Sequence, residues 1–309
     1  MPLPLRVKAD LALVGVIFIW GTSFVIVKTA LADASPLMFL LLRFAIAGLA
    51  MLALSWRSRA PAEPGALRAG AVIGFFLFAG FTFQTIGLHY TTPTKSAFIT
   101  ALSVPLVPLL LVFVLRHRPR WEALAGIAAA TLGMYLLTVP PGAFHIAGGD
   151  LLTLVCALAF AAHIVAIGRY APRFGHSHLA LGQILVALAL FVLLAPVAGV
   201  TGLDPLEVRW SLRLVLALGV TGLLATALAF SVQTWAQQFT LPTHTAIIFS
   251  LEPVFAALTS FVVLEERLGW RGLLGAAFIL FGVLLVELRG TPAPMDAVGA
   301  ANPSGDGRV

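Results

Sequence analysis

Long apolar runs separated by short polar connections fill almost the whole chain. A helix that crosses the hydrocarbon core of a membrane needs about 20 apolar residues, and the runs have this length. The breaks between the runs predict ten helices. We expect these helices at residues 11–29, 36–56, 70–90, 94–115, 121–139, 150–169, 178–199, 212–237, 243–264 and 270–288. The pattern therefore predicts an all-α polytopic membrane protein with ten transmembrane helices.

The two halves of the chain are copies of each other, in register at an offset of 149 residues from Gly70 onward. The match needs no gap, and it pairs residue types that apolar helices do not share by chance. The pairs include Gln84/Gln233, Thr85/Thr234, Pro93/Pro242, Trp121/Trp270, Gly126/Gly275 and Gly133/Gly282. A looser match at an offset of 140 pairs Asp10 with Asp150, Trp20 with Phe160 and Arg43 with Gln183. A self-copy of this length in an apolar chain is typical of duplicated membrane transporters.

Each copy holds five of the predicted helices, which gives two expected repeats at residues 11–139 and 150–288. Because five is an odd number, the second copy enters the membrane in the opposite direction to the first. The matched connections agree, since the basic residues 116–120 correspond to the Glu-Glu-Arg-Leu-Gly run at 265–269. Inverted repeats form a binding site near the middle of the membrane and expose it to alternate sides. Residues 289–309 are rich in Gly, Pro and Ala, and we expect them to be a disordered cytoplasmic tail.

The composition excludes a soluble protein. Hydrophobic residues make up 60% of the chain and charged residues only 10%, whereas an average soluble domain has about 25% charged residues. The net charge of +6 comes from Lys and Arg in short connections, where such residues set membrane orientation, so we expect no nucleic-acid partner. The basic residues are more numerous on the side of the N-terminus. We therefore expect a multi-pass protein of the plasma (inner) membrane of a prokaryote, with both termini cytoplasmic.

Several short motifs follow one another in a defined order along the chain. They are Trp20-Gly21-Thr22-Ser23 with Lys28 in the first helix, Arg43-Phe44 in the second, Ser250-Leu251-Glu252-Pro253 in the ninth, and then Leu264-Glu265-Glu266-Arg267. With the duplication, this order resembles the EamA family of the drug/metabolite transporter superfamily over residues 11–288. The resemblance implies ten helices in two EamA repeats and transport of small metabolites, often export. Arg116-His117-Arg118 departs from the family's usual Gly-Glu-Arg, and this departure affects a loop rather than the site.

Two charged residues lie inside predicted helices, where a charge costs at least about 2.5–3.5 kcal/mol. Arg43 lies seven residues into the second helix, and Glu252 lies nine residues into the ninth. Both are candidates for a central cavity. Glu252 either carries a proton or binds a substrate amine, or it is a polar partner for the backbone that Pro253 disturbs. Arg43 either binds a carboxylate or pairs with Glu252, or its side chain extends to the membrane surface.

Polar and aromatic residues on other helices are further candidates for the cavity. Gln84 and Gln233 occupy equivalent positions of the third and eighth helices, where they either line a shared cavity or form interhelical hydrogen bonds. His163 in the sixth helix is either a packed neutral side chain or a proton relay. Trp20, beside Gly21, is either a packing residue or a gate on the substrate path.

Prolines and glycines indicate where helices bend and where they approach closely. Pro105 and Pro108 should kink the fourth helix, and Pro253 should disturb the ninth, which would let one half bend against the other. The fifth and tenth helices carry small faces at Gly126, Gly133, Gly275 and Gly282. These two helices should therefore pack tightly, either against each other or against a second protomer in a homodimer.

Together these features predict a secondary transporter of small metabolites that works by alternating access, with export and amino acids or related compounds favoured. The substrate would contact Arg43, Gln84, Gln233, Glu252 and Trp20, and Glu252 or His163 would couple transport to protons. The alternatives are an intramembrane enzyme and a membrane scaffold or sensor. The sequence has no HExxH, no Gly-x-Ser-x-Gly and no mid-depth aspartate pair, and its loops are too short for a sensor domain. We therefore expect no catalytic residue, no cofactor and no metal ion, with a small-molecule substrate and the lipid bilayer as partners.

Overall fold

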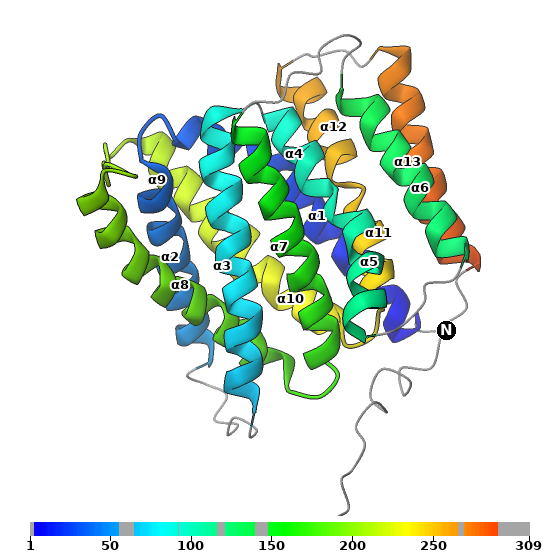
Figure 1. Cartoon of the computed structure of the whole chain (residues 1–309), viewed down its shortest axis with the longest axis horizontal. Coiled ribbons are helices and arrows are strands. Elements are labelled where there is room, and N and C mark those ends of the chain that lie inside the picture. The colour runs from blue at the N-terminus through cyan, green and yellow to red at the C-terminus, as the bar shows by residue number, and fades with distance from the viewer. Residues whose placement is uncertain are drawn as a thin grey trace, which may run out of the picture.

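The computed structural model describes residues 3–55, 65–91, 93–115, 121–139, 148–264 and 269–289, and within these ranges the regular structure is helical (Figure 1). The helices in chain order are α1 (Leu5–Ala30), α2 (Pro36–Ser55), α3 (Ala66–Tyr90), α4 (Pro93–Ala101), α5 (Ser103–Leu115), α6 (Trp121–Thr138), α7 (Gly148–Tyr170), α8 (His176–Thr201), α9 (Leu212–Gly219), the π-helix η1 (Val220–Leu228), α10 (Ala229–Ala236), α11 (Pro242–Phe249), α12 (Glu252–Leu264) and α13 (Trp270–Arg289). The predicted tail beyond Arg289 and the connections 116–120 and 265–268 lie outside the described residues.

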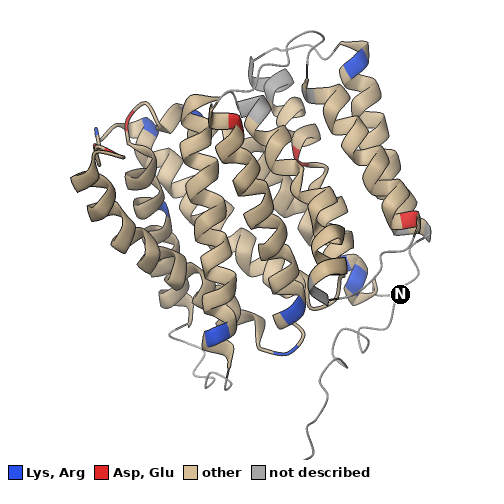
Figure 2. Ribbon diagram, in the orientation of Figure 1, with Lys and Arg blue, Asp and Glu red and all other residues tan. Residues whose placement is uncertain are grey.

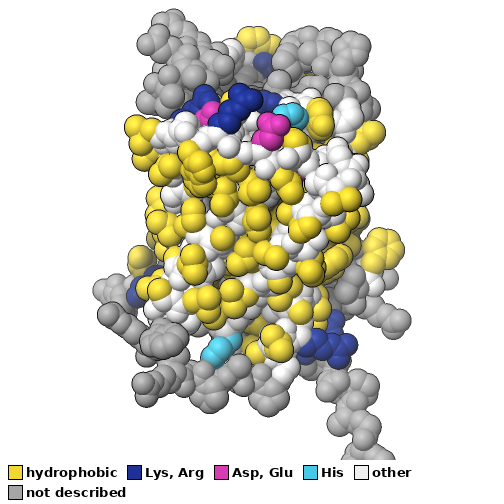
Figure 3. Space-filling model, turned by 90° about the vertical axis from the view of Figure 1, so that its left-hand side faces the viewer, with side chains coloured by type: hydrophobic (Ala, Val, Ile, Leu, Met, Phe, Trp, Pro, Cys, Tyr) yellow, Lys and Arg dark blue, Asp and Glu magenta, His cyan; other side chains and the backbone are white. Residues whose placement is uncertain are grey.

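The helices form the ten spans that the sequence predicts. Seven stretches of the described residues are long and apolar enough to cross a membrane, and two of them run through α4–α5 and through α9–η1–α10. The shorter apolar helices α6 and α13 and the interrupted pair α11–α12 complete the ten. Figure 3 shows a broad belt of hydrophobic side chains on one face, and Figure 2 shows most of the Lys, Arg, Asp and Glu residues near the two ends of the helices. The protein is therefore a polytopic membrane protein whose outer surface matches lipid.

The fourth helix of each repeat is interrupted at the same position. In the first repeat the break falls at Leu102, between α4 and α5, and in the second it falls at residues 250–251, between α11 and α12. Each break lies just before a proline, Pro105 or Pro253. Proline has no N–H, and its ring collides with the carbonyl four residues earlier, so a regular helix cannot continue through this point. By contrast, α5 continues through Pro108.

The fifth helices of the two repeats, α6 and α13, pack against each other along their glycines (Figure 1). A Cβ atom at Gly126 would lie 2.8 Å from the Gly282 carbonyl oxygen, and one at Gly133 would lie 2.5 Å from the Gly275 carbonyl oxygen. The first glycine of each helix thus meets the second glycine of the other, which requires antiparallel helices. The two repeats are therefore inverted. Since these glycine faces are used within one chain, they are not available to a second protomer.

The two repeats also interleave. Helix α1 of the first repeat packs on α10, α11 and α12 of the second, and α7 of the second repeat packs on α3, α4 and α5 of the first. Two bundles result, which we call the α1 bundle (α1 with α10–α12) and the α7 bundle (α7 with α3–α5). Each bundle contains helices from both repeats.

Candidate functional site

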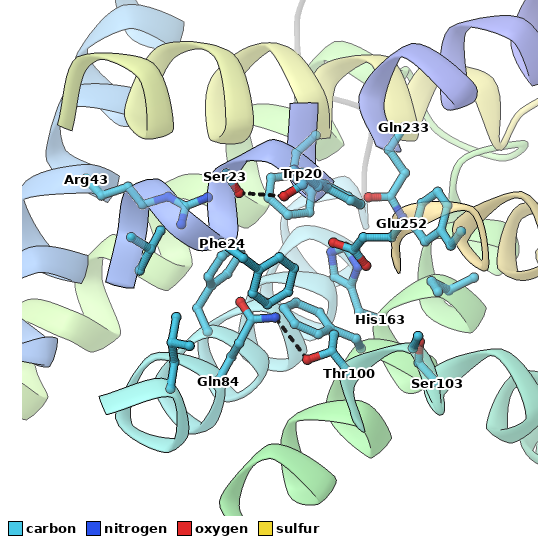
Figure 4. A pocket seen from close by; sticks show the side chains of 18 residues that line it. Trp20, Ser23, Phe24, Arg43, Gln84, Thr100, Ser103, His163, Gln233 and Glu252 are labelled. Carbon is cyan, nitrogen blue, oxygen red and sulfur yellow. Dashed lines mark hydrogen bonds between the residues drawn. The ribbon is translucent and has the colours of Figure 1, made fainter. Parts of the chain in front are cut away.

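A cavity lies at the centre of the molecule, between the two bundles (Figure 4). The empty space between its walls is about 700 Å³, including the part that is open to solvent. The lining residues are Trp20, Ser23, Phe24, Val27, Arg43, Phe81, Gln84, Leu88, Thr100, Ala101, Ser103, Phe160, His163, Ile164, Phe230, Gln233, Phe249 and Glu252.

Most of the cavity wall is built from equivalent positions of the two repeats. Seven pairs supply 14 of the 18 lining residues. They are Phe81/Phe230, Gln84/Gln233, Thr100/Phe249 and Ser103/Glu252 at the offset of 149, and Trp20/Phe160, Ser23/His163 and Phe24/Ile164 at the offset of 140. The looser match of the first helices is thereby supported. The polar pairs Ser23/His163 and Ser103/Glu252 differ in chemistry, so the two halves of the wall are not interchangeable.

Arg43 of α2 points into the cavity and does not extend to the membrane surface, since only 3% of it is exposed (Figure 4). Its Nε donates to the Thr226 hydroxyl at 2.7 Å, and its Cζ lies 4.4 Å from the centroid of the Phe81 ring, in a cation–π contact. No carboxylate of the described residues lies within ion-pair distance, so the expected alternative of a pair with Glu252 is not formed. A buried guanidinium among neutral groups is suited to an incoming carboxylate.

The Ala225 carbonyl orients two cavity side chains. Trp20 Nε1 donates to it at 2.8 Å, and Arg43 Nη2 lies 3.4 Å from it. Ala225 belongs to the π-helix η1, in which hydrogen bonds reach five residues back. The Ala229 N–H, which an α-helix would direct to this carbonyl, bonds to other carbonyls instead. The sequence analysis predicted one regular helix here and missed this feature. A possible signal was the five-residue spacing of Thr221 and Thr226, since the second hydroxyl donates to the first residue's carbonyl.

Glu252 is the first residue of α12, immediately after the break in the ninth span, and it is buried in the cavity wall. The N–H groups of a first helical turn have no acceptor within the helix, and the helix dipole favours negative charge there. Gly21 allows α1 to approach this point, because a Cβ atom there would lie 2.8 Å from the Glu252 carbonyl oxygen. The break therefore places the Glu252 carboxyl group at the start of a helix, in the wall of the cavity.

The two equivalent glutamines differ in their hydrogen bonds. Gln84 Nε2 donates to the Thr100 hydroxyl at 3.2 Å (Figure 4). Gln233 Nε2 donates to Gln237 Oε1 at 3.0 Å, and the Gln233 carbonyl oxygen is buried without a hydrogen-bond partner. Gln237, which the sequence analysis did not select, therefore sets the orientation of the Gln233 amide.

His163 lies in the cavity wall but is held by its neighbours. Its Nε2 lies 2.8 Å from Gln183 Oε1, and Gln183 Nε2 donates to the Thr234 hydroxyl at 2.9 Å. Because Thr234 in turn donates to the Phe230 carbonyl, the amide of Gln183 is oriented and its oxygen accepts from His163. The alternative of a packed histidine matches this arrangement. The sequence analysis identified Gln183 only as the repeat partner of Arg43.

Comparison with known proteins decides the family. The profile of the EamA-like transporter family matches residues 7–139 and matches again at residues 147–288. The chain belongs to the EamA-like transporter family.

The relatives of this EamA-like protein carry transporter names. It is 38% identical over 286 residues to an "Uncharacterized transporter" of Archaeoglobus fulgidus, which covers 92% of this chain and 87% of the relative. It is 26% identical over 292 residues to the "Uncharacterized inner membrane transporter YedA" of Escherichia coli strain K12, covering 92% and 93%. It is 27% identical over 290 residues to a "Probable amino-acid metabolite efflux pump" of Salmonella typhimurium, covering 87% and 91%. The protein is therefore a membrane transporter and not an enzyme.

A solved crystal structure shares the fold of this EamA-like transporter. The TM-score is 0.74 at 21% sequence identity, and the match covers 92% of this chain and 97% of the other. This likeness concerns the fold alone.

The predicted prolines and glycines of the EamA-like transporter do not line the cavity. None of Pro105, Pro108 and Pro253 is among the residues that line the cavity, and neither is any of the four helix-packing glycines. Two of the prolines still shape the wall, because the breaks before them bring Ser103 and Glu252 to the starts of α5 and α12.

Proposed function

We propose that the protein is a secondary exporter of small zwitterionic metabolites, amino acids or related compounds. The observation that carries this proposal is the pair of ionisable groups in one cavity. Arg43 enters from the first repeat without a carboxylate partner among the described residues, and Glu252 enters from the second. A substrate with a carboxylate and an amine would complement both groups. The efflux-pump name of the Salmonella relative, at 27% identity, supports export of such compounds.

Alternating access is the mechanism that best suits this cavity. Inverted repeats reach two arrangements related by a pseudo-two-fold axis in the membrane plane when one bundle rocks against the other, and the binding site stays at the repeat interface. The seven equivalent pairs in the wall support this proposal, because they place the cavity at the interface between the two repeats. The six aromatic rings of the wall would pack on the apolar part of a substrate.

Glu252 is the residue that we propose for proton coupling. It faces the cavity at the start of a helix, and no side-chain hydrogen bond is found for it within the described part of the chain. His163 is less suited, because its Nε2 already bonds to Gln183. The excess of basic residues on the N-terminal side further supports a protein of the inner membrane with both termini cytoplasmic, as does the inner-membrane name of the Escherichia coli relative.

Counterflow in proteoliposomes tests the proposed function. A panel of labelled amino acids is exchanged by the wild type, by Glu252→Gln and by Glu207→Gln, which changes an exposed glutamate in a connection. We expect saturable exchange that is pH-dependent in the wild type and in Glu207→Gln, and that is lost or pH-independent in Glu252→Gln. Exchange that is indifferent to pH and to Glu252→Gln would refute proton coupling. Absence of exchange for every amino acid would refute the substrate class.

A further inference from the structure

The Gln233 carbonyl oxygen is an acceptor without a donor in the wall of the cavity. Gln233 is 0% exposed, and its Oε1 has no hydrogen-bond partner. A buried polar atom in this state costs about 1–3 kcal/mol, so it is retained where something else satisfies it. Figure 4 shows the Gln233 side chain reaching from α10 toward the cavity, on the same side as Glu252.

The orientation of the Gln233 amide follows from its neighbours. Gln237 Nε2 donates to the Ile164 carbonyl of α7 at 2.9 Å, and a carbonyl can only accept. Gln237 therefore directs its Oε1 toward Gln233, and the Gln233 Nε2 donates to it. The free atom of Gln233 is then the oxygen. The Ile164 carbonyl thus fixes the orientation of the Gln237 amide, and Gln237 fixes the orientation of the Gln233 amide in the cavity wall.

We infer that the Gln233 carbonyl oxygen accepts a hydrogen bond from a free amine of the substrate, and that Gln237 positions it for this contact. This inference rests on the proposed function. The equivalent Gln84 uses its Nε2 on Thr100, so the equivalent position does not reproduce this amide chain. The cavity therefore selects an unblocked amine close to Glu252. A protonated amine offers three charged donors, enough for Gln233 and Glu252 together, whereas a hydroxyl or an acylated nitrogen offers one neutral donor and binds less tightly.

Binding of three related compounds tests this inference. L-phenylalanine, its α-hydroxy analogue phenyllactate and N-acetyl-L-phenylalanine are titrated into the purified protein, with intrinsic tryptophan fluorescence as the readout. For the wild type we expect phenylalanine to bind about tenfold or more tightly than either analogue. Gln237→Leu should lose this discrimination while its affinity for phenyllactate stays the same. Gln237→Glu should retain discrimination, because a protonated carboxyl group can donate to Ile164 and accept from Gln233.

Gln238→Leu is the matched control. Gln238 also donates to a backbone carbonyl, that of Ala171 directly after α7, at 3.0 Å, but it does not bond to Gln233. It should keep the discrimination of the wild type. Equal binding of all three compounds by the wild type, or full discrimination by Gln237→Leu, would overturn the inference while the proposed function stands. If none of the three compounds binds, the inference and the zwitterion proposal both fall.

A second inference comes from the two ends of the cavity. At the end where α1 and α3 finish, Lys28 Nζ donates to the carbonyls of Leu88, His89 and Thr91 at 2.6, 3.1 and 2.9 Å. We call this group the lysine closure. Lys28 follows the lining residue Val27, and Leu88 itself lines the cavity. The lysine closure therefore borders the cavity and links α1 of the α1 bundle to the end of α3 of the α7 bundle.

The opposite end is tied at the equivalent place by different groups. There Gln237 and Gln238, at the end of α10, donate to the carbonyls of Ile164 and Ala171 of the α7 region. We call this group the glutamine closure. Gln237 and Gln238 are the repeat partners of Leu88 and His89, at the offset of 149. Donor and acceptor roles are exchanged between the two ends. In the lysine closure, α1, the first helix of its repeat, supplies the donor. In the glutamine closure, α7, the first helix of the other repeat, supplies the acceptor carbonyl of Ile164.

The geometry points to the two closures as the contacts that open in turn during alternating access. Helices α1 and α3, and likewise α7 and α10, approach each other at few other places, so these side chains supply the main links between those helices at each end. The lysine closure contains a charge-assisted donor, whereas the glutamine closure is neutral, so the two ends differ in strength.

Labelling of a cavity cysteine from each face tests this second inference. The single native cysteine is replaced (Cys156→Ala), and the reporter Ser23→Cys is placed in the wall. An impermeant thiol reagent is applied to right-side-out and to inside-out vesicles. Lys28→Met should raise the labelling rate from the face where α1 ends by about tenfold, and Gln238→Leu should raise it from the opposite face by about fivefold.

Lys8→Met supplies the control, since it makes the same change at an exposed position of the same helix. It should leave the ratio of the two labelling rates unchanged. The inference is overturned if Lys28→Met and Gln238→Leu raise labelling from the same face, or if neither changes the ratio. Labelling requires no substrate, so a wrong choice of substrate class would not produce either result.

Discussion

Asp10 and Asp150 occupy equivalent positions in the two repeats, and each accepts a hydrogen bond from the equivalent threonine of the opposite repeat. Thr91 donates to Asp150 at 2.7 Å, and Thr240 donates to Asp10. Thr91 and Thr240 are themselves repeat partners, at the offset of 149. Each bond lies within one bundle, and the two bonds lie at opposite ends of the molecule. The aspartates therefore fasten the start of a first helix to the end of a third helix from the other copy.

This equivalence predicts similar costs for the two threonine substitutions. Thr91→Val and Thr240→Val should each lower the free energy of unfolding by about 1.5–3 kcal/mol, the range for hydrogen bonds to charged groups. Thermal unfolding in detergent measures the effect. Thr82→Val is the control, because the Thr82 hydroxyl bonds only to the carbonyl of its own helix at Phe78. A large cost at one threonine and none at the other would show that the two fastenings are not equivalent.

The glycine contact between α6 and α13 predicts a strong effect of a single methyl group. In Gly133→Ala the new Cβ would lie 2.5 Å from the Gly275 carbonyl oxygen and 2.8 Å from the Ile279 nitrogen. Because both neighbours are backbone atoms, the helices must separate, and we expect a loss of about 1–3 kcal/mol in the free energy of unfolding. Gly15→Ala adds the same methyl group on α1 with no atom within 4 Å, and it should be neutral or slightly stabilising. Unfolding midpoints of the two variants, measured side by side, decide the matter.

Arg43 should control recognition of a substrate carboxylate. Arg43→Gln should reduce affinity for L-phenylalanine by about 10- to 100-fold and leave affinity for L-phenylalaninamide, which lacks the carboxylate, nearly unchanged. Arg43→Lys should restore only part of the affinity, because an ammonium group cannot keep both the Thr226 bond and the contact over the Phe81 ring. Arg173→Gln, at an exposed position, serves as the control. An equal loss for both ligands in Arg43→Gln would assign Arg43 a structural role.

The contacts of Asp33, which follows α1 in the chain, predict how the stability of the protein depends on pH. The Ser211 hydroxyl donates to its carboxylate at 2.6 Å and Arg213 pairs with it at 2.8 Å, and these contacts lower the pKa of Asp33. Because the pKa of Asp33 is lower in the folded state than in the unfolded state, its contacts stabilise the protein at pH values above the unfolded pKa of about 3.9. This stabilisation is lost as the pH falls through the folded-state pKa. The difference in unfolding midpoint between the wild type and Asp33→Asn should therefore be constant from about pH 5 to pH 8 and shrink in more acidic buffer. A difference that grows on acidification would contradict the assignment.

Much of the architecture could be predicted because membrane insertion leaves a one-dimensional signal. Apolar run lengths predicted the ten spans, and paired residues such as Gln84 and Gln233 predicted the duplication. The odd number of helices in each copy predicted its inversion. One cavity is lined by all of the substrate-site residues that the sequence analysis selected, namely Trp20, Arg43, Gln84, Gln233 and Glu252. Their roles in transport remain predictions. The π-helix and the amide chain through Gln237 were missed, because both depend on local hydrogen bonds that no periodicity records.

The sequence by itself determined that this protein is an inverted-repeat membrane transporter, because lipid demands long apolar helices and an odd-numbered duplication must invert. Only the tertiary structure decided which helices pack together across the copies and which atoms face the cavity. Arg43 turned to Thr226 and Phe81 rather than to Glu252, and Gln233 was left with a free oxygen because Gln237 is held by the Ile164 carbonyl. Such outcomes depend on distances and directions between distant segments, and a linear pattern of residue types does not contain them.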